Sequence, residues 1–463
     1  MKLYNTLGRT IQELKPLKPG EVSLYTCGPT VYHFYHIGNL RKSVFDDTLK
    51  RALMLHDYGV KHVMNTTDVG HLTTDADEGD DKLQSRANEE GKTVWEVAKF
   101  YTKAFVEDMA ALNVLPPGKL VPATQAIDQQ IKMVQVLLDK GFAYQVKQAI
   151  YFDVTKLDDY GKLTGQKLDQ KATAARKDVV TDPEKKHPQD FALWFFTVGR
   201  FKNHQMHWDS PWGKGFPGWH LECSAIIERE LGDTVDIHTG GVDHIGTHHT
   251  NEIAQSEAAH DGKPLASIWM HSEFLLVDGT KMSKSLKNTY TLSDVSKKGF
   301  SPLDLRLFYL QAHYRTQQNF TWESLQAAKN RLESINAWAD RRHQDIPDSR
   351  AEQLLLAATR EMQNALANDL DTPRVLAVLS DVMNAGVVPN KEFLQYLDTA
   401  LGLMLADRTD ITAEQKKLIA ERDAARANKD FNASDKLRDE LLKDGIVVED
   451  TAKGARWSRR PSA

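Results

Sequence analysis

A strand–helix–strand pattern near the N-terminus limits the fold most tightly. In residues 21–27, apolar and polar side chains alternate and strand-forming residues are frequent. Residues 38–59 carry leucines in a pattern typical of a helix, and residues 60–64 form a second strand-like run. This spacing fits a βαβ unit, in which ligands bind outside the carboxyl ends of the parallel strands. We therefore expect a ligand site built from residues 27–39 and 65–68.

The rest of the chain alternates strand and helix before it becomes helical. Residues 140–205 mix short strand-like pieces with charged, turn-rich stretches, and we interpret them as an insertion between two halves of one parallel-sheet domain. After Phe300, apolar residues recur at helical spacing. The sequence thus predicts an α/β domain with an insertion, followed by an α-helical region.

The composition is that of an ordinary soluble protein. Of the 463 residues, 41% are hydrophobic and 27% are charged, and the formal net charge is −5. No run approaches the ~20 apolar residues of a membrane span, and the N-terminal segment lacks the apolar region of a secretory signal. We therefore expect a cytoplasmic protein that does not bind membranes. The charge balance argues against a generally basic nucleic-acid-binding surface but allows a local one.

Two short motifs point to a nucleotide. His36-Ile37-Gly38-Asn39 opens the predicted helix, where free N–H groups attract anions and glycine allows a close approach to the backbone. Lys281-Met282-Ser283-Lys284-Ser285 follows a turn, and lysines on a loop can neutralise the charge that builds on a leaving pyrophosphate. Each motif alone also fits an ordinary helix start or a solvated basic loop. Together they favour an ATP site that activates a carboxylate.

A metal site is the third candidate. His248 and Glu252 are spaced i, i+4 and share one helix face, while Cys27 ends the first predicted strand and Cys223 lies on another predicted helix. Two thiolates, one imidazole and one carboxylate suit Zn²⁺. The alternative is two buried free thiols, because a disulfide is rare in a cytosolic protein. Three further histidines compete as ligands or as phosphate and ribose contacts: His238, His244 and His249.

Several longer segments resemble the cysteinyl-tRNA synthetases. The resemblance covers nearly the whole chain, and several of its motifs are long enough to be specific. It is carried by residues 27–32, 218–224, 236–241, 248–256, 281–285, 369–373, 444–451 and 454–457.

The resemblance implies a class I synthetase. Its fold would be a Rossmann-type catalytic domain with an insertion, followed by an α-helical C-terminal region, and its partners would be ATP, L-cysteine and tRNA-Cys. We expect a monomer. The implied divisions are 1–139 and 206–290 for the two catalytic halves, 140–205 for the insertion, 291–340 for a stem-contact region, 351–404 for a helical anticodon-binding bundle and 411–463 for a C-terminal tRNA-binding module.

The same resemblance assigns residues to the site. One zinc ion would be bound by Cys27, Cys223, His248 and Glu252 and would recognise the substrate thiol, and ATP would arrive with Mg²⁺. The residues implied in ATP binding and catalysis are His36, Gly38, Asn39, Lys281 and Lys284, with Gly38 in binding only. The residues implied to line the cysteine pocket are Gly28, Thr67, Trp219, His220 and His238.

Zinc would supply a selectivity that shape cannot. Cysteine and serine differ by one atom, and shape gives only modest discrimination, whereas zinc binds a thiolate much better than a hydroxyl. Four protein ligands usually mark a closed, structural zinc, so a sensing ion must gain a fifth ligand or loosen one. We hypothesise that Glu252, the hardest donor of the set, is the ligand that loosens.

The chain departs from the family's motifs at two positions. Asn39 stands where the family often has histidine, so this residue can donate a hydrogen bond but cannot become charged. Lys287 stands where a glycine commonly precedes the asparagine, and it adds a positive charge beside the second motif. The acidic run between Asp75 and Asp81 also differs from the better-known members.

The C-terminal tail is a candidate contact region for tRNA. A basic segment around an aromatic suits stacking on an unpaired base, so we predict tRNA contacts from Arg456, Trp457, Arg459 and Arg460.

Two rival functions remain at this point. A cysteine ligase of mycothiol synthesis would form the same adenylate and pass cysteine to an amino sugar, but it would lack a full region like 351–463. A non-catalytic paralogue would not need both lysines of the second motif and four ligands. We therefore favour transfer of cysteine to tRNA.

Overall fold

The computed structural model describes residues 1–72, 80–165, 183–282, 286, 288–345, 350–451 and 454–460. The chain divides into two compact units. The first comprises Met1–Leu292, Tyr314–Asn319 and Ala367–Leu370, and the second comprises Ser293–His313, Phe320–Leu366 and Asp371–Ala463.

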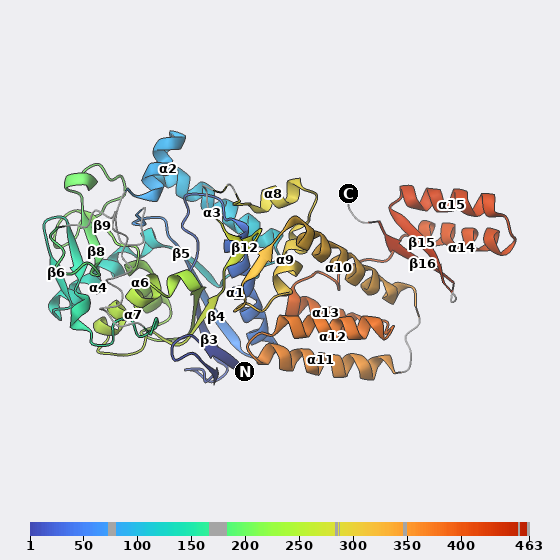
Figure 1. The fold of residues 1–463 in the computed structure, drawn as a ribbon, viewed down its shortest axis with the longest axis horizontal. Helices are drawn as coiled ribbons and strands as arrows, with labels where there is room; N and C mark the ends of the chain where they lie inside the picture. The colour runs from blue at the N-terminus through green and yellow to red at the C-terminus, as the bar shows by residue number, and fades with distance from the viewer. Residues whose placement is uncertain are drawn as a thin grey trace. The chain divides into compact units, whose positions relative to one another are not determined.

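A five-stranded parallel sheet forms the centre of the first unit. Its order is β11-β10-β3-β4-β5, and its first three strands in sequence carry the blue to cyan colours of Figure 1. The chain adds β4 and β5 on one side of β3, and later adds β10 and β11 on the other, so the order reverses between β3 and β10. Ligands bind at such a switch point. The bounds are Glu21–Thr26 for β3, Gly59–Thr66 for β4, Lys119–Pro122 for β5, Val235–Gly241 for β10 and Ala266–Ser272 for β11.

The predicted βαβ unit is confirmed as β3, helix α1 (Ile37–Leu55) and β4. The helix begins where the His36 side chain accepts hydrogen bonds from the backbone N–H groups of Gly38 and Asn39, each at 3.2 Å. Most of its apolar residues are buried, among them Leu40 and Leu53, and the helix packs on β4 and β10 of the sheet. The N-terminus of α1 is thereby held beside the carboxyl end of β3.

Further helices and smaller sheets complete the first unit. A four-stranded antiparallel sheet of order β6-β7-β8-β9 lies between β5 and α6 in sequence. Its last strand ends at Pro217, beyond the residue 205 at which we expected the insertion to end, because β9 pairs with β8. The predicted domain boundaries stay predictions.

The remaining helices of the first unit are α2 (Lys82–Glu90), α3 (Val94–Ala111), α4 (Ile127–Asp139), α6 (Leu221–Glu230) and α7 (His248–Ala259). The short strands are β1 (Lys2–Asn5), β2 (Thr10–Glu13), β6 (Ala143–Gln145), β7 (Ala149–Phe152), β8 (Phe191–Phe196), β9 (Gly215–Pro217), β12 (Leu275–Val277), β13 (Thr280–Lys281) and β14 (Gln318–Phe320).

The second unit is mostly helical, as predicted, and ends in a β-hairpin. Its helices are α8 (Leu292–Lys297), which begins at the last residue of the first unit, then α9 (Pro302–Leu310), α10 (Trp322–Asp340), α11 (Ala351–Ala367), α12 (Thr372–Asn384), α13 (Lys391–Leu401), α14 (Ala413–Ala427) and α15 (Phe431–Lys443). Strands β15 (Ile446–Thr451) and β16 (Gly454–Arg459) pair antiparallel. We call α14, α15, β15 and β16 the C-terminal module (Figure 1). None of the described helices has the length and apolarity that a membrane crossing requires.

The C-terminal module has its own small core. Trp457 of β16 is buried there with Leu441 of α15 and Ile446 and Val448 of β15. Base stacking needs an exposed aromatic face, whereas this indole is 7% exposed. In this structure Trp457 therefore packs the module.

Candidate active site

A cavity of about 430 Å³ opens at the carboxyl ends of the central strands. Cys27 follows β3, Gly241 ends β10 and Ser272 ends β11, and all three line the cavity. The first turn of α1 closes the same space with Gly38 and Asn39. The parallel sheet thus brings residues from three distant parts of the sequence, near 27–39, 241 and 272, to one edge.

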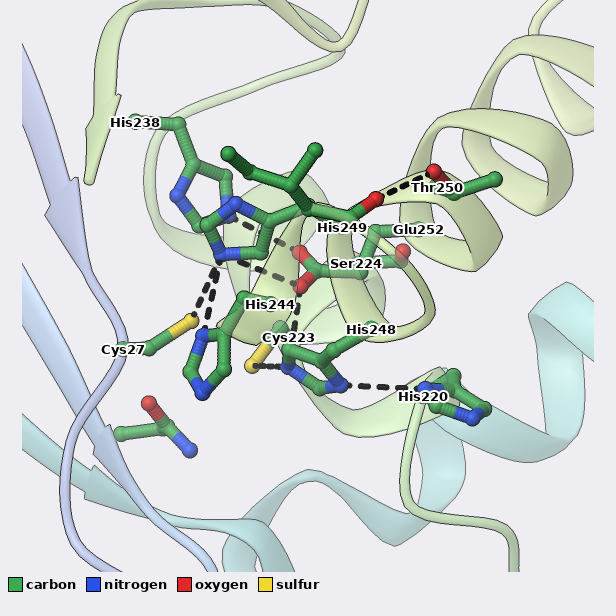
Figure 2. A network of polar contacts seen from close by, with 12 residues as sticks. Cys27, His220, Cys223, Ser224, His238, His244, His248, His249, Thr250 and Glu252 are labelled. Atoms are coloured by element: carbon green, nitrogen blue, oxygen red, sulfur yellow. Dashed lines mark hydrogen bonds and ion pairs between the residues drawn. The ribbon is translucent and has the colours of Figure 1, made fainter. Parts of the chain in front are cut away.

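The four predicted metal ligands meet at one side of this cavity. Each of Cys27, Cys223, His248 and Glu252 offers a ligand atom, and these atoms all lie within 4.8 Å of one another. Figure 2 shows the cluster: Cys27 comes from the end of β3, Cys223 from α6, and His248 and Glu252 from successive turns of α7. His248 Nε2 lies 3.5 Å from Cys223 Sγ and 2.9 Å from Glu252 Oε1. All four side chains are buried.

A second ligand set overlaps the first. His238 and His249 also lie within 4.8 Å of Cys27 and Glu252 at their ligand atoms. His238 Nε2 is 2.9 Å from Glu252 Oε2, and His249 Nε2 is 3.3 Å from Cys27 Sγ. The Glu252 carboxylate thus has an imidazole at each oxygen, His248 at one and His238 at the other. His238 and His249 therefore remain alternatives to Cys223 and His248 as metal ligands in the structure, as the sequence had left open.

Aromatic and imidazole rings orient His248. Its Nδ1 lies 3.0 Å from His220 Nδ1, which leaves Nε2 facing the thiols and the carboxylate. The Trp219 ring stacks on the His248 ring at 4.3 Å, and His71 stacks on Trp219 at 4.1 Å. Such outer contacts fix the orientation of a metal-binding imidazole.

The electrostatics of the cluster favour one thiolate and one carboxylate. Burial opposes ionisation of Cys27, but a hydrogen bond from Cys223 and the nearby His249 hold the pKa of the Cys27 thiol well below its ordinary value. Burial and the adjacent Cys27 raise the pKa of Cys223. Burial also opposes ionisation of Glu252, but His248 and His238 lower its pKa to about 2. Negative charge is therefore held where a cation would bind.

The residues predicted for the cysteine pocket divide into two groups. Gly28 and Trp219 line the cavity. The other three, Thr67, His220 and His238, are buried side chains next to it. A Cβ on Gly28 would lie 1.8 Å from the backbone oxygen of Asn65, so this close approach of β3 and β4 requires glycine.

Sequence reasoning missed a buried carboxyl group beside this pocket. Glu222 Oε1 accepts hydrogen bonds from Thr67 Oγ1 and from Asn65 Nδ2, the latter at 2.9 Å. Asn65 in turn accepts from the Gly28 N–H at 2.8 Å. Burial raises the pKa of Glu222 well above its ordinary value. The sequence signals that could have found Glu222 were its position beside Cys223 and its place within the segment 218–224 that carries the family resemblance.

The nucleotide motifs lie at the other side of the cavity. His36, Gly38, Asn39 and Lys281 all line it. Burial lowers the pKa of His36 to about 4, so this imidazole is neutral at pH 7 and its Nδ1 caps α1. The predicted ATP contact Lys284 lies outside the described residues, as do Lys287 and most of the acidic run from Asp75 to Asp81.

The predicted tRNA residues of the tail make intramolecular contacts. Arg456 donates to Asp345 at 2.9 Å, and Arg459 donates to Asp340 at 2.8 Å. Both acids lie at or just after the end of α10. The role of the tail in tRNA binding stays a prediction.

Comparisons with known proteins agree along the whole chain. Residues 13–330 match the family model of the class I (C) tRNA synthetase catalytic domain, and residues 408–457 match that of the cysteinyl-tRNA ligase anticodon-binding domain. The chain is 40% identical to a cysteine–tRNA ligase of Treponema denticola over 99% of both proteins. It is 43% identical to cysteine–tRNA ligase 1 of Burkholderia lata over 98% of this chain and 96% of that protein.

Solved structures share the fold at low sequence identity. A Mycobacterium tuberculosis methionyl-tRNA synthetase in complex with methionyl-adenylate superposes with a TM-score of 0.58 at 14% identity, covering 83% of this chain and 88% of that one. An Agrobacterium radiobacter leucyl-tRNA synthetase complex gives a TM-score of 0.62 at 12% identity, covering 86% and 87%.

Proposed function

Because the chain belongs to the cysteine–tRNA ligase family of class I synthetases, we propose that it activates L-cysteine with ATP and transfers it to tRNA-Cys. One observation carries the proposal: the Cys27, Cys223, His248 and Glu252 cluster opens on the cavity that the N-terminus of α1 also lines. A thiol-binding centre and a phosphate-binding helix end thus share one space.

The donor set fits zinc. Two thiols, an imidazole and a carboxylate are the ligands that Zn²⁺ takes, and thiolates favour it over harder cations. We propose Cys27, Cys223, His248 and Glu252 as its ligands, because the overlapping set with His238 and His249 offers one thiol instead of two. When bound, the ion would supply a Lewis-acid site on the cavity wall that prefers a thiolate to a hydroxyl.

The chain's own residues would position the two reactants. Lys281 and the positive end of the α1 helix dipole would attract the phosphates of ATP, which arrives with Mg²⁺. The carboxylate oxygen of cysteine then attacks the α-phosphorus in line, a P–O bond forms, and the bond to pyrophosphate breaks. The terminal hydroxyl of the tRNA next attacks the acyl carbonyl and releases AMP. Positioning and charge stabilisation carry these steps, so no covalent nucleophile from the protein is needed.

We also propose that Glu252 is the ligand that loosens when a thiol enters. Its second oxygen is already 2.9 Å from His238 Nε2, so the carboxylate keeps a partner if it leaves the metal. Zinc X-ray absorption with and without cysteine tests this, and an unchanged spectrum at saturating cysteine would contradict a thiol-sensing ion.

The rival functions lose support. An amino-sugar ligase does not explain the match of residues 408–457 to a tRNA-ligase anticodon domain. A non-catalytic paralogue does not explain a cluster of four buried ligand groups, two of which, Cys27 and His248, line an open cavity. We further propose that the protein acts as a cytoplasmic monomer.

Two assays test the function in sequence. Cysteine-dependent exchange of pyrophosphate into ATP should occur, with serine as the control amino acid giving far less exchange. Charging of tRNA-Cys should follow. Absence of exchange in zinc-loaded protein would refute the proposal, and exchange without charging would support the amino-sugar ligase instead.

A further inference from the structure

A lysine that the function has not used lies on the wall of the cavity. Lys42 is on α1, four residues after Gly38, so the two residues share one face of the helix. Both line the cavity. The Lys42 side chain is 14% exposed. It stands between Cys27, at the thiol end, and the first turn of α1, at the phosphate end.

Two oxygens fix the Lys42 ammonium at this point. Nζ donates to the backbone oxygen of Cys27 at 2.5 Å and lies 2.6 Å from Asp46 Oδ2. The other carboxylate oxygen, Asp46 Oδ1, accepts from Thr239 Oγ1 of β10 at 2.7 Å. Asp46 is buried and anchored to a different strand, so it restricts the lysine to one position. An ammonium has three donors, and the hydrogen bond to Cys27 O and the ion pair with Asp46 leave donor capacity for a further acceptor.

The chemistry of activation needs a cation at this junction. The substrate carboxylate must approach the α-phosphate of ATP, and the two anions repel each other at close range. Among the described residues that line the cavity, the lysines are Lys42 and Lys281. His36 is neutral at pH 7, and Asn39 carries no charge.

We propose that Lys42 binds the carboxylate of the substrate amino acid and holds it for attack on the α-phosphorus. This inference rests on the proposed function and adds a residue to it. A remaining donor of the ammonium makes the contact, while the hydrogen bond to Cys27 O and the ion pair with Asp46 keep the ammonium in place.

Binding of two ligands that differ only in the carboxylate tests the role. L-cysteine has a thiol, an ammonium and a carboxylate, and cysteamine lacks only the carboxylate. Both are titrated by calorimetry into zinc-loaded wild type and Lys42→Met. A hydrogen bond between charged groups corresponds to about 10- to 150-fold in affinity. We expect a loss of that size for cysteine and a change of less than about 2-fold for cysteamine.

Two further variants control for folding and for general charge. Lys50→Met removes a lysine of the same helix whose Nζ also donates to a backbone oxygen, that of Pro116, outside the cavity. It should leave both affinities unchanged. The double variant Lys42→Met/Asp46→Asn avoids leaving a buried carboxylate unpaired and should reproduce the selective loss of cysteine affinity.

The outcomes separate this role from others. Equal losses for both ligands would overturn it, because Lys42 would then only position Cys27. Unchanged affinity for cysteine would overturn it as well. A wild type that binds neither ligand would refute the proposed function itself, and it is distinguished by the absence of cysteamine binding.

Discussion

Replacing Asp340 with asparagine should loosen the C-terminal module from α10. Asp340 is fully buried at the end of α10 and accepts hydrogen bonds from two arginines. Arg408 donates to both carboxylate oxygens, at 2.9 and 2.5 Å, and Arg459 of β16 donates to one of them at 2.8 Å. One buried carboxylate therefore connects α10, the segment before the module and the module itself.

The expected loss follows from the geometry. Removing one partner of a buried ion pair costs about 3–5 kcal/mol. The Arg408 and Arg459 side chains are 20% and 32% exposed, so water can partly replace the lost carboxylate. The amide oxygen of asparagine also keeps one acceptor. We therefore expect a loss of about 2–3 kcal/mol in the local opening free energy of the module.

Amide hydrogen exchange of β16 measures this quantity. The Trp457 N–H donates to the Gln344 side chain at 2.9 Å, so its exchange reports on docking. A loss of about 2–3 kcal/mol should speed exchange about 30- to 150-fold. Asp345→Asn is the matched control, because Asp345 also binds an arginine of β16, Arg456, but is 18% exposed. Its effect should stay below about 1 kcal/mol.

Activity assays give a second test of the Asp340→Asn variant. Asp340→Asn should leave cysteine-dependent pyrophosphate exchange intact and weaken tRNA charging at limiting tRNA. Truncation after Ala452 tests this less cleanly, because it also removes β16 and Trp457 from the module core. Equal exchange rates in the Asp340 and Asp345 variants would refute the reasoning from burial.

Three further predictions concern the first unit. Cys223→Ser should weaken zinc binding by at least about 100-fold in a chelator competition and abolish cysteine activation, and unchanged zinc affinity would remove Cys223 from the ligand set. Burial lowers the pKa of His62 to about 3. The neutral imidazole therefore contributes fully to stability above about pH 6.5, and this contribution is lost by ~1.4 kcal/mol per pH unit as pH falls toward 3. The free energy of unfolding of His62→Gln should depend less steeply on pH in this range, and the same pH dependence as wild type would contradict a neutral buried imidazole. Gly28→Ala places a Cβ 1.8 Å from the Asn65 backbone oxygen and should lower the melting temperature by several degrees, whereas Gly59→Ala, whose nearest atom is 3.6 Å away, is the control for added bulk.

The local elements of the site followed from the sequence because their signals are local. The spacing of strand, helix and strand predicted β3, α1 and β4, and the rule that ligands bind at carboxyl strand ends placed Cys27 and the first turn of α1 at the site. The i, i+4 spacing of His248 and Glu252 put them on one helix face, and α7 keeps them there.

Other features had no unambiguous local signal. Trp457 lies in a basic segment, and an aromatic in that setting suits either base stacking or a core position; the packing of β15 and β16 against α15 decided for the core. The choice between ligand sets was equally undetermined, because His238 lies on β10, which pairs with β3, whereas His249 reaches Cys27 from α7.

By itself, the sequence determined the types of candidate ligand, the βαβ unit of β3, α1 and β4, and the start of α1 after His36. Only the tertiary structure decided which charges face the reacting groups. Lys42 and Asp46 are an ordinary i, i+4 pair in the sequence, but the fold brings Thr239 from β10 to Asp46 and the Cys27 carbonyl to Lys42. Such contacts join residues up to 193 positions apart. They depend on the packing of the whole sheet, which the local preferences of neighbouring residues do not specify.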